Sequence, residues 1–335
     1  ANTLGASDAG SIVLFGTNTE LTDSTVSSET SAEEDGGNAG SVSIGFLAEV
    51  VDEDTLEIIE EMRPSSSVKL RATGPNPDPD SEESLTFVTA STRGSGAAGN
   101  VVIRSASLES IGLDGGRVTL ASRSTDAGAA GVVTLVADTI NLTGTDVAAE
   151  NAGASNGFET AIDVRATAGD LILGDSTVIA NTLGASDAGS IVLFGTNTEL
   201  TDSTVSSETS AAVSGGNAGS ITIDAEGVEY PDGAVTLSGS TALTATTTGS
   251  GNAGSITVSG NSITAVGDRA AYPADPANTD SPIRIASASS SGKFDSEGNE
   301  LEPTAAEKAI LGQSGVISLA AETISLTNTE VSAKN

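Results

Sequence analysis

The sequence lacks most of the residues that enzymes and metal sites use. Its 335 residues include no Cys, no His and no Trp, with only 2 Tyr and 6 Phe. Without His or Cys the chain cannot form a Ser-His-Asp or Cys-His nucleophile, a disulfide, or an imidazole or thiolate site for zinc or haem iron. The chemistry that remains is that of carboxylates, hydroxyls, amides, Lys and Arg.

Positive charge is also scarce. Only 13 Lys and Arg residues stand against 46 Asp and Glu residues, for a formal charge of −33. Such a charge disfavours nucleic acid and anionic membrane surfaces as partners. It also has a plain interpretation as a surface that favours solubility and resists pairing between strand edges. No apolar run is long enough to span a membrane, and the start shows neither an initiator Met nor a signal segment. We expect the chain to be part of a longer protein.

A long internal duplication dominates the sequence. Residues 1–32 recur without a change as residues 180–211, an offset of 179. The segment 36–41 matches 215–220 at the same offset, and 134–151 matches 318–335 at an offset of 184. We therefore divide the chain into a first long repeat, residues 1–179, and a partial second one, residues 180–335.

A shorter repeat lies inside the long one and is marked by Ala-Gly followed by a short β-branched run. The first inward-facing residues of the units are expected at Ile12, Val42, Val68, Val101, Val133, Ile162, Ile191, Ile221, Ile256, Ile283 and Ile317. Their mean spacing is 30.5 residues, and six units span the offset of 179. Repeats of this length cannot bury their own apolar face and must stack on their neighbours.

Two patterns predict the structure of a unit. Each unit opens with period-two alternation, such as Ile12-Val13-Leu14, which is typical of a strand with one buried face. Many units then place a Val five residues after a Leu, with Gly, Asp, Asn, Ser and Thr between them as a tight corner. We expect polar corner residues to bond one turn along and the Ala-Gly glycine to supply positive φ.

These patterns predict an all-β fold: a right-handed parallel β-helix, or β-solenoid, of about eleven turns of roughly 30 residues. Helical solenoids are disfavoured because no sustained helical apolar period is present and the units are rich in Val, Ile, Thr, Ser and Gly. With about 4.8 Å between stacked strands, eleven turns would be on the order of 50 Å long and a six-turn repeat about 29 Å. We expect one continuous β-helix over residues 1–335.

The segments 216–223 and 251–258 carry Gly-Asn-Ala-Gly-Ser-Ile-Thr followed by Ile or Val, with a Leu-x4-Val strand after the first pattern. This resembles the haemagglutinin-type repeat of large exoproteins of the two-partner secretion pathway, the filamentous haemagglutinin-like adhesins, with the cyanobacterial members looking nearest. The resemblance implies a long right-handed β-helix, export to the cell surface or beyond, and a role in adhesion, aggregation or matrix building. The family's amino-terminal secretion domain is not visible in the sequence.

Four stretches interrupt the rhythm and are expected to form inserted loops: 52–63, 73–84, 271–282 and 294–308. The first could be an acidic strand or a helical turn, and the last could hold a short helix. The second is Pro-rich and contains Asp78, Asp80, Glu82 and Glu83, whose oxygen ligands suit calcium, although acidic loops are more often only solvated. Calcium is the one cofactor considered, and only weakly; otherwise no cofactor is expected.

Three functions fit these features. The first is a structural segment of an extracellular fibre or adhesin that acts by stiffness, repeated surface and self-association. The second is a module that binds surface glycans or cell-surface proteins through the loops 73–84 and 271–282. The third is a polysaccharide-active enzyme, which is disfavoured because an exact repeat places the same outward groups at two heights. We expect no enzyme and name no catalytic residue.

Overall fold

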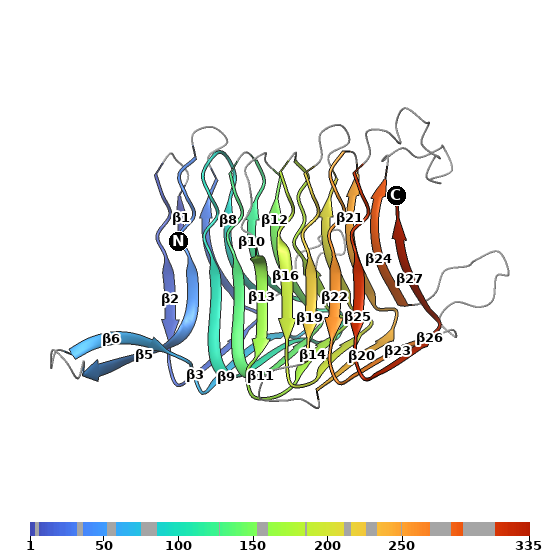
Figure 1. Cartoon of the computed structure of the whole chain (residues 1–335). Coiled ribbons are helices and arrows are strands. Elements are labelled where there is room, and N and C mark those ends of the chain that lie inside the picture. The colour runs from blue at the N-terminus through green and yellow to red at the C-terminus, as the bar shows by residue number, and fades with distance from the viewer. Residues whose placement is uncertain are drawn as a thin grey trace.

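The computed structural model describes residues 1–3, 7–31, 36–51, 58–74, 86–126, 128–152, 160–184, 186–210, 216–225, 233–248, 250–268, 283–290 and 312–335. Within these residues the chain is all-β and contains no helix. Most strands pair in parallel with the equivalent strand of the next unit, and the strands stack along one axis from the N-terminal to the C-terminal end (Figure 1). The expected all-β, solenoid-like stacking of parallel strands is confirmed.

Three stacks of parallel strands make up the fold, and we call them the first, second and third faces. The first face begins each unit and contains β2 (Ile12–Phe15), β5 (Val42–Val51), β9 (Val101–Gly112), β11 (Val133–Thr143), β13 (Thr160–Ala166), β16 (Ser190–Phe194), β19 (Ile221–Asp224), β22 (Ile256–Ser259) and β25 (Ile317–Ala320). The second face contains β3 (Asn18–Thr22), β7 (Ser67–Ala72), the later halves of β9 and β11, β14 (Leu171–Gly174), β17 (Thr198–Thr201), β20 (Ala234–Gly239), β23 (Ser262–Gly267) and β26 (Thr323–Thr327).

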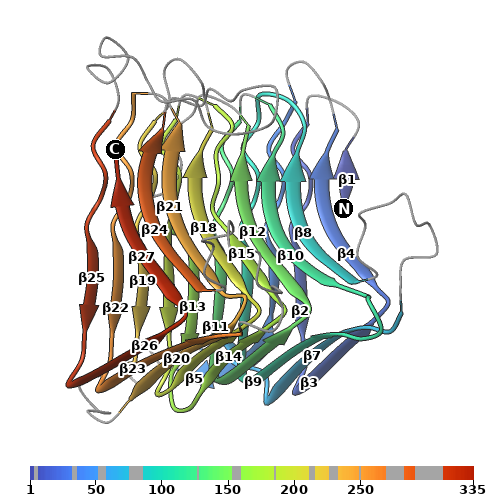
Figure 2. The same cartoon turned by 90° about the vertical axis from the view of Figure 1, so that its right-hand side faces the viewer.

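The third face returns the chain to the start of the next unit. It contains β1 (Asn2–Thr3), β4 (Thr25–Thr30), β8 (Thr86–Thr92), β10 (Val118–Ser124), β12 (Thr145–Asn151), β15 (Thr177–Ile179), β18 (Thr204–Thr209), β21 (Ala242–Thr248), β24 (Ile283–Ser290) and β27 (Thr329–Lys334). These ten strands form one sheet. Because β9 and β11 each cross two faces, the first and second faces form one continuous sheet whose strand order closes on itself, and Figure 2 shows how it meets the third face.

The nine strands of the first face define nine coils, which we number coil 1 to coil 9 in chain order. Nine of the expected unit starts lie in one line along this face, from the pair Ile12 and Val42 to the pair Ile256 and Ile317. The other two do not begin coils, because Val68 pairs with Thr19 and Leu108 on the second face and Ile283 pairs with Thr329 on the third.

The expected eleven turns are therefore too many. Insertions place 59 residues between the starts of coils 2 and 3 and 61 between those of coils 8 and 9, and the mean spacing of about 30 split each long unit in two. The 179-residue offset corresponds to five coils, from Ile12 in coil 1 to Ile191 in coil 6, rather than six. At about 4.8 Å per strand the long repeat is roughly 24 Å, and the nine coils are on the order of 40 Å.

Aliphatic side chains line the inside of the coils. The alternating positions of each first-face strand are fully buried in the interior coils, as at Val101 and Ile103 or Ile221 and Ile223. The Leu-x4-Val pairs, such as Leu200 and Val205, place the Leu on the second face and the Val on the third. Each fully buried side chain of this size contributes about 1.5–3 kcal/mol, which explains how so few aromatic residues suffice.

The corner between the second and third faces uses a residue with positive φ two positions after the Leu. In the described residues these are Asp23, Gly144, Asp175, Asp202, Gly239 and Asn328, with φ between 45° and 65°. Asp and Asn tolerate this conformation better than other L-residues, and Gly adopts it without steric cost. The corner that the Leu-x4-Val spacing predicts is confirmed.

The Ala-Gly turns stack the backbone of one coil directly on that of the next. A Cβ atom added to Gly99 would meet the carbonyl of Gly40, and one added to Gly219 would meet the carbonyl of Gly189. None of these glycines is among the described residues with positive φ. The expectation that they supply positive φ is therefore wrong: they are glycine because a neighbouring coil leaves no room for a side chain.

A buried Ser joins the Ala-Gly turns of successive coils. The Ser122 hydroxyl donates to the Gly99 carbonyl at 2.8 Å and accepts from the Gly131 N–H at 2.7 Å, so it spans coils 3 and 4. Ser28, Ser207 and Ser287 make the same two bonds in coils 1–2, 6–7 and 8–9. One Ser therefore serves two coils.

The aligned position in each intervening coil is Ala. Along the third face this line reads Ser28, Ala90, Ser122, Ala149, Ala180, Ser207, Ala245, Ser287 and Ala333. Alternation holds everywhere except at coil 5, where two Ala residues follow each other. The five-coil repeat thus contains two Ser-bridged pairs of coils and one coil without a bridging Ser.

Polar residues at the turns also bond one coil along, as expected. The Asp8 carboxylate accepts from the Asn38 N–H at 2.7 Å, and the Asn38 side-chain carbonyl accepts from the Ala97 N–H at 2.8 Å. In the second copy, Asp187 and Asn217 form the same kind of ladder toward Asn252. These bonds satisfy backbone N–H groups that the turns leave without a strand partner.

Replacement of Ser122 by Ala tests the bridging bonds. Two buried backbone groups would lose their partner, and we expect the free energy of unfolding to fall by about 1–3 kcal/mol. Ser105→Ala is the matched control, because Ser105 is also buried and its hydroxyl has no partner among the described residues. Urea denaturation of the two variants measures the difference, and equal stabilities would contradict a structural role for the bridge.

Candidate functional site

The acidic residues proposed as calcium ligands lie outside the described residues. Asp78, Asp80, Glu82 and Glu83 belong to 75–85, and the expected loops 271–282 and 294–308 also fall wholly outside the description. Among the residues that are described, no group of three or more Asp and Glu side chains lies close enough together to hold a metal ion. Calcium binding at 78–83 stays a prediction.

The first inserted stretch forms part of an antiparallel ribbon. Strand β6 (Ile58–Arg63) pairs with the later part of β5, from Phe46 opposite Arg63 to Val51 opposite Ile58. The ribbon projects from the stack near its N-terminal end (Figure 1). Of the two alternatives for 52–63, the strand is correct for 58–63, and 52–57 are not described. Two apolar runs flanking the acidic segment 52–57 are the hairpin signal that the sequence analysis missed.

The exact copies present the same outward side chains in coils 1 and 6, but with different neighbours. Phe194 lies between Arg165 of coil 5 and Asp224 of coil 7. Phe15, its copy in coil 1, pairs with Gly45 and is 58% exposed. The duplication therefore repeats the outward groups of one coil, while the surroundings of each group depend on the adjacent coils.

Carboxylates in the parallel strands are kept apart from one another. On the second face Glu20 pairs with Lys69, and Lys69 pairs with Glu109. On the third face Arg123 pairs with Glu150. In every parallel pair printed for the described strands, a carboxylate stands beside a basic, polar or apolar residue and never beside another carboxylate. Like charges one strand apart would destabilise the sheet.

Arg117 forms the most extensive charged contact in this set. Its guanidinium donates to the Asp146 carboxylate at 2.6 and 2.8 Å and to the Thr177 hydroxyl at 3.2 Å, and it lies 3.7 Å from Asp175. The hydrogen bonds to Asp146 raise the pKa of Arg117 above its usual value. The contact joins coils 3, 4 and 5. Since these groups are partly exposed, each ion pair contributes about 0–1 kcal/mol.

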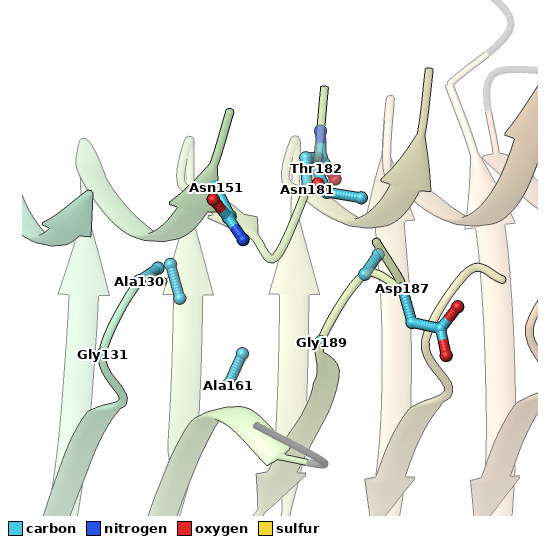
Figure 3. Close-up of a pocket in the computed structure, with 10 residues that line it drawn as sticks. Ala130, Gly131, Asn151, Ala161, Asn181, Thr182, Asp187 and Gly189 are labelled. Atoms are coloured by element: carbon cyan, nitrogen blue, oxygen red, sulfur yellow. The ribbon is translucent and has the colours of Figure 1, made fainter. Parts of the chain in front are cut away.

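A small hollow lies between coils 4, 5 and 6 at the Ala-Gly turns. Figure 3 shows Ala161 between the turns of Gly131 and Gly189, with Asn151 and Asn181 above it. Ala161 stands in a β-bulge, because Thr160 pairs with Ser190 and Ile162 with Ile191. The cavity volume is about 20 Å³. That is room for about one water, and far too little for a sugar residue.

The Asp23 carboxylate joins the corner of coil 1 to coil 2. It accepts hydrogen bonds from the Thr73 N–H at 2.9 Å and from the Thr73 hydroxyl at 2.5 Å. These two bonds lower the pKa of Asp23 from its usual value of 3.8, the hydroxyl having the larger effect. Asp202, the copy of Asp23 in coil 6, accepts from the Ser240 N–H of coil 7 at 2.8 Å, so both copies fasten a corner to the following coil.

Comparison of the chain with protein-family models, with curated proteins and with solved structures found no match. The resemblance to haemagglutinin-type repeats therefore stays a prediction. Within the described ranges, no helix is long and apolar enough to cross a membrane.

The pKa of Asp23 provides a test of the corner contact. Thr73→Val removes the hydroxyl donor, and we expect the Asp23 pKa, followed by NMR of its carboxyl carbon, to rise toward 3.8. A lowered folded-state pKa stabilises the fold above the unfolded pKa, and this stabilisation is lost as the pH falls through the folded pKa. Thr22→Val is the control in the same corner. An unchanged Asp23 pKa in Thr73→Val would contradict the assignment.

Proposed function

We propose that this chain is a structural segment of a long, repetitive extracellular fibre or adhesin, built as a right-handed parallel β-helix. The observation that carries the proposal is the exact copy of residues 1–32 in residues 180–211, which begins equivalent coils five apart. An active site needs particular residues at one place, whereas a fibre gains from presenting the same groups at regular intervals. The right-handed sense follows the strong preference of parallel strand connections.

The fold supports mechanical stiffness as the physical basis of this function. Backbone hydrogen bonds join every coil to the next on three faces, and one aliphatic interior runs through the stack. Bending such a stack would open several strand pairs at once. Repeated outward groups about 24 Å apart, five strand spacings, allow many weak attachments along one chain.

The charge pattern supports an exposed and soluble surface. The carboxylates separated on the parallel strands leave a net charge of −33, which keeps lateral surfaces apart and again disfavours nucleic acid as a partner. Export to the cell surface follows from the haemagglutinin resemblance and has the same standing as that resemblance. Calcium bridging through Asp78, Asp80, Glu82 and Glu83 would fit an exported acidic protein, and we keep it as part of the proposal.

Immunogold electron microscopy of source cells tests the fibre proposal. An antibody raised against the duplicated segment 17–30 should label filaments of narrow, uniform width outside the cell or on its surface. Blocking with the free peptide is the control for specific labelling. Label confined to the cell interior, or to discrete globular particles, would refute the proposal.

A second function is favoured by the β5–β6 ribbon, which shows that an insertion can project from the stack as an ordered element. In this alternative, the inserted segments 73–84 and 271–282 bind a surface glycan or a cell-surface protein. Deletion of 271–282 should then abolish attachment to cells while the thermal transition stays nearly unchanged. Deletion of 52–57 serves as the matched control. Equal attachment by both deletion variants would reject this alternative.

A further inference from the structure

The two end faces of the coil stack are copies of interior faces. In coil 1, Leu14 and Leu21 are partly exposed, whereas their copies in coil 6, Leu193 and Leu200, are fully buried by coil 5. In coil 9, Leu326 is 43% exposed, whereas the equivalent Leu142 of coil 4 is fully buried. Both end faces therefore have the shape and the apolar surface of faces that are stacked on another coil inside the same chain.

From these faces we propose that coil 9 of one copy of this chain stacks on coil 1 of a second copy, in the register of the interior coils. The proposal deepens the proposed fibre function by naming the contact, and it rests on that function for its biological meaning. The occupant of each end face is a second copy of this chain, because the two faces complement each other strand for strand.

The strand register supports the alignment. The first-face line runs from Val133 through Ile162 to Ile191, so coil 4 and coil 6 hold their inward residues at the same level. Coil 9 repeats coil 4 and coil 1 repeats coil 6, which brings Ile317 over Ile12. In the interior, Ile256 N–H donates to the Val316 carbonyl at 2.9 Å. The equivalent bond across the junction is from Ile317 N–H to the Ser11 carbonyl of the second copy.

The Ser–Ala alternation continues across the junction. Coil 9 has Ala333 in this line and coil 1 has Ser28, which is the order found where coil 2 meets coil 3 and where coil 7 meets coil 8. Ser28 already bonds to Gly10 and Gly40 in coils 1 and 2, so the junction needs no additional bridging Ser. A junction in the opposite orientation would not align these lines.

Charges at the junction are also compatible. Following the strand register, Glu330 of coil 9 comes to lie over Thr25, and Ser325 over Glu20. Lys334 comes to lie over Glu29. No carboxylate is brought over another carboxylate, as in the parallel strand pairs of the interior. The chain has a net charge of −33, so this separation is a condition for close contact between two copies.

One segment competes with the junction. Strand β1 pairs Asn2 with Glu29 and Thr3 with Thr30, and these are the two positions that Lys334 and Asn335 would reach. Stacking in this register therefore displaces Ala1–Thr3 or the last two residues. Deletion of Ala1–Thr3 should raise association severalfold, and an unchanged or lower association would contradict the register.

Cysteine cross-linking tests the proposal directly, because the chain contains no Cys. Val13 and Ser318 are outward residues on one line of the first face, at opposite ends of the stack. Under mild oxidation, Val13→Cys/Ser318→Cys should give a ladder of dimers, trimers and longer species on a non-reducing gel. An intramolecular bond is excluded by the length of the stack, and adjacent parallel strands bring Cα atoms within the range of a disulfide.

Three control variants make the result decisive. Val192→Cys/Thr222→Cys places the pair on adjacent coils of one chain and shows that this geometry can form the bond. Val13→Cys/Thr222→Cys moves one Cys to the interior coil 7, and Val13→Cys alone reports head-to-head contact. We expect the ladder in the end-to-end variant to exceed both of the latter at least tenfold. The proposal is overturned if the intrachain control forms its bond and the end-to-end variant gives no more ladder than they do.

The outcome separates this proposal from the fibre function. Head-to-tail ladders in solution together with globular or intracellular label in cells would refute the fibre while supporting the stacking contact. Filaments in cells together with no ladder would support the fibre and overturn the contact.

Discussion

The close backbone contact between successive coils is the constraint on which the rest of the structure depends. At the Ala-Gly turns, one coil lies so near the next that a Cβ on Gly40, Gly99 or Gly254 would overlap the backbone of its neighbour. This contact fixes the level of every coil, and with it the alignment of the inward Ile, Val and Leu residues. The buried Ser residues then satisfy the carbonyl and N–H groups that the turns leave between coils.

Much of this organisation could be predicted from the sequence, because a stacked repeat writes its contacts as periodicity. Period-two alternation located the first-face strands, and the Leu-x4-Val spacing located the corner between the second and third faces. The errors at Val68 and Ile283 have one cause. Their strands also begin with inward β-branched residues, and the insertions lengthen coils 2 and 8 until a second unit seems to fit. Spacing alone cannot tell which face a strand occupies.

The alternating Ser and Ala residues could not be recognised before the register was known. Ser28 and Ala90 are separated by insertions, whereas Ser122 and Ala149 are not, so the two pairs have different spacings in the sequence. The candidate calcium residues have the opposite problem. Composition identified Asp78 and its neighbours, but an inserted segment has no periodicity from which its geometry could be derived. The repeat thus informs on the coils and not on what is inserted between them.

The duplicated block shows that burial in this fold is a property of position and not of sequence alone. Leu14 and Leu193 have identical flanking residues, yet only Leu193 has a coil on both sides and is fully buried. Each coil therefore gains its stability from two interfaces, and a coil with one interface forgoes about half of that gain. The same arithmetic explains the charge pattern. With strands about 4.8 Å apart, one carboxylate over another would weaken an interface that each coil needs. The parallel strands avoid it, and in the described residues the one pairing of Glu with Glu, Glu49 with Glu60, falls in the β5–β6 ribbon, where no coil is stacked.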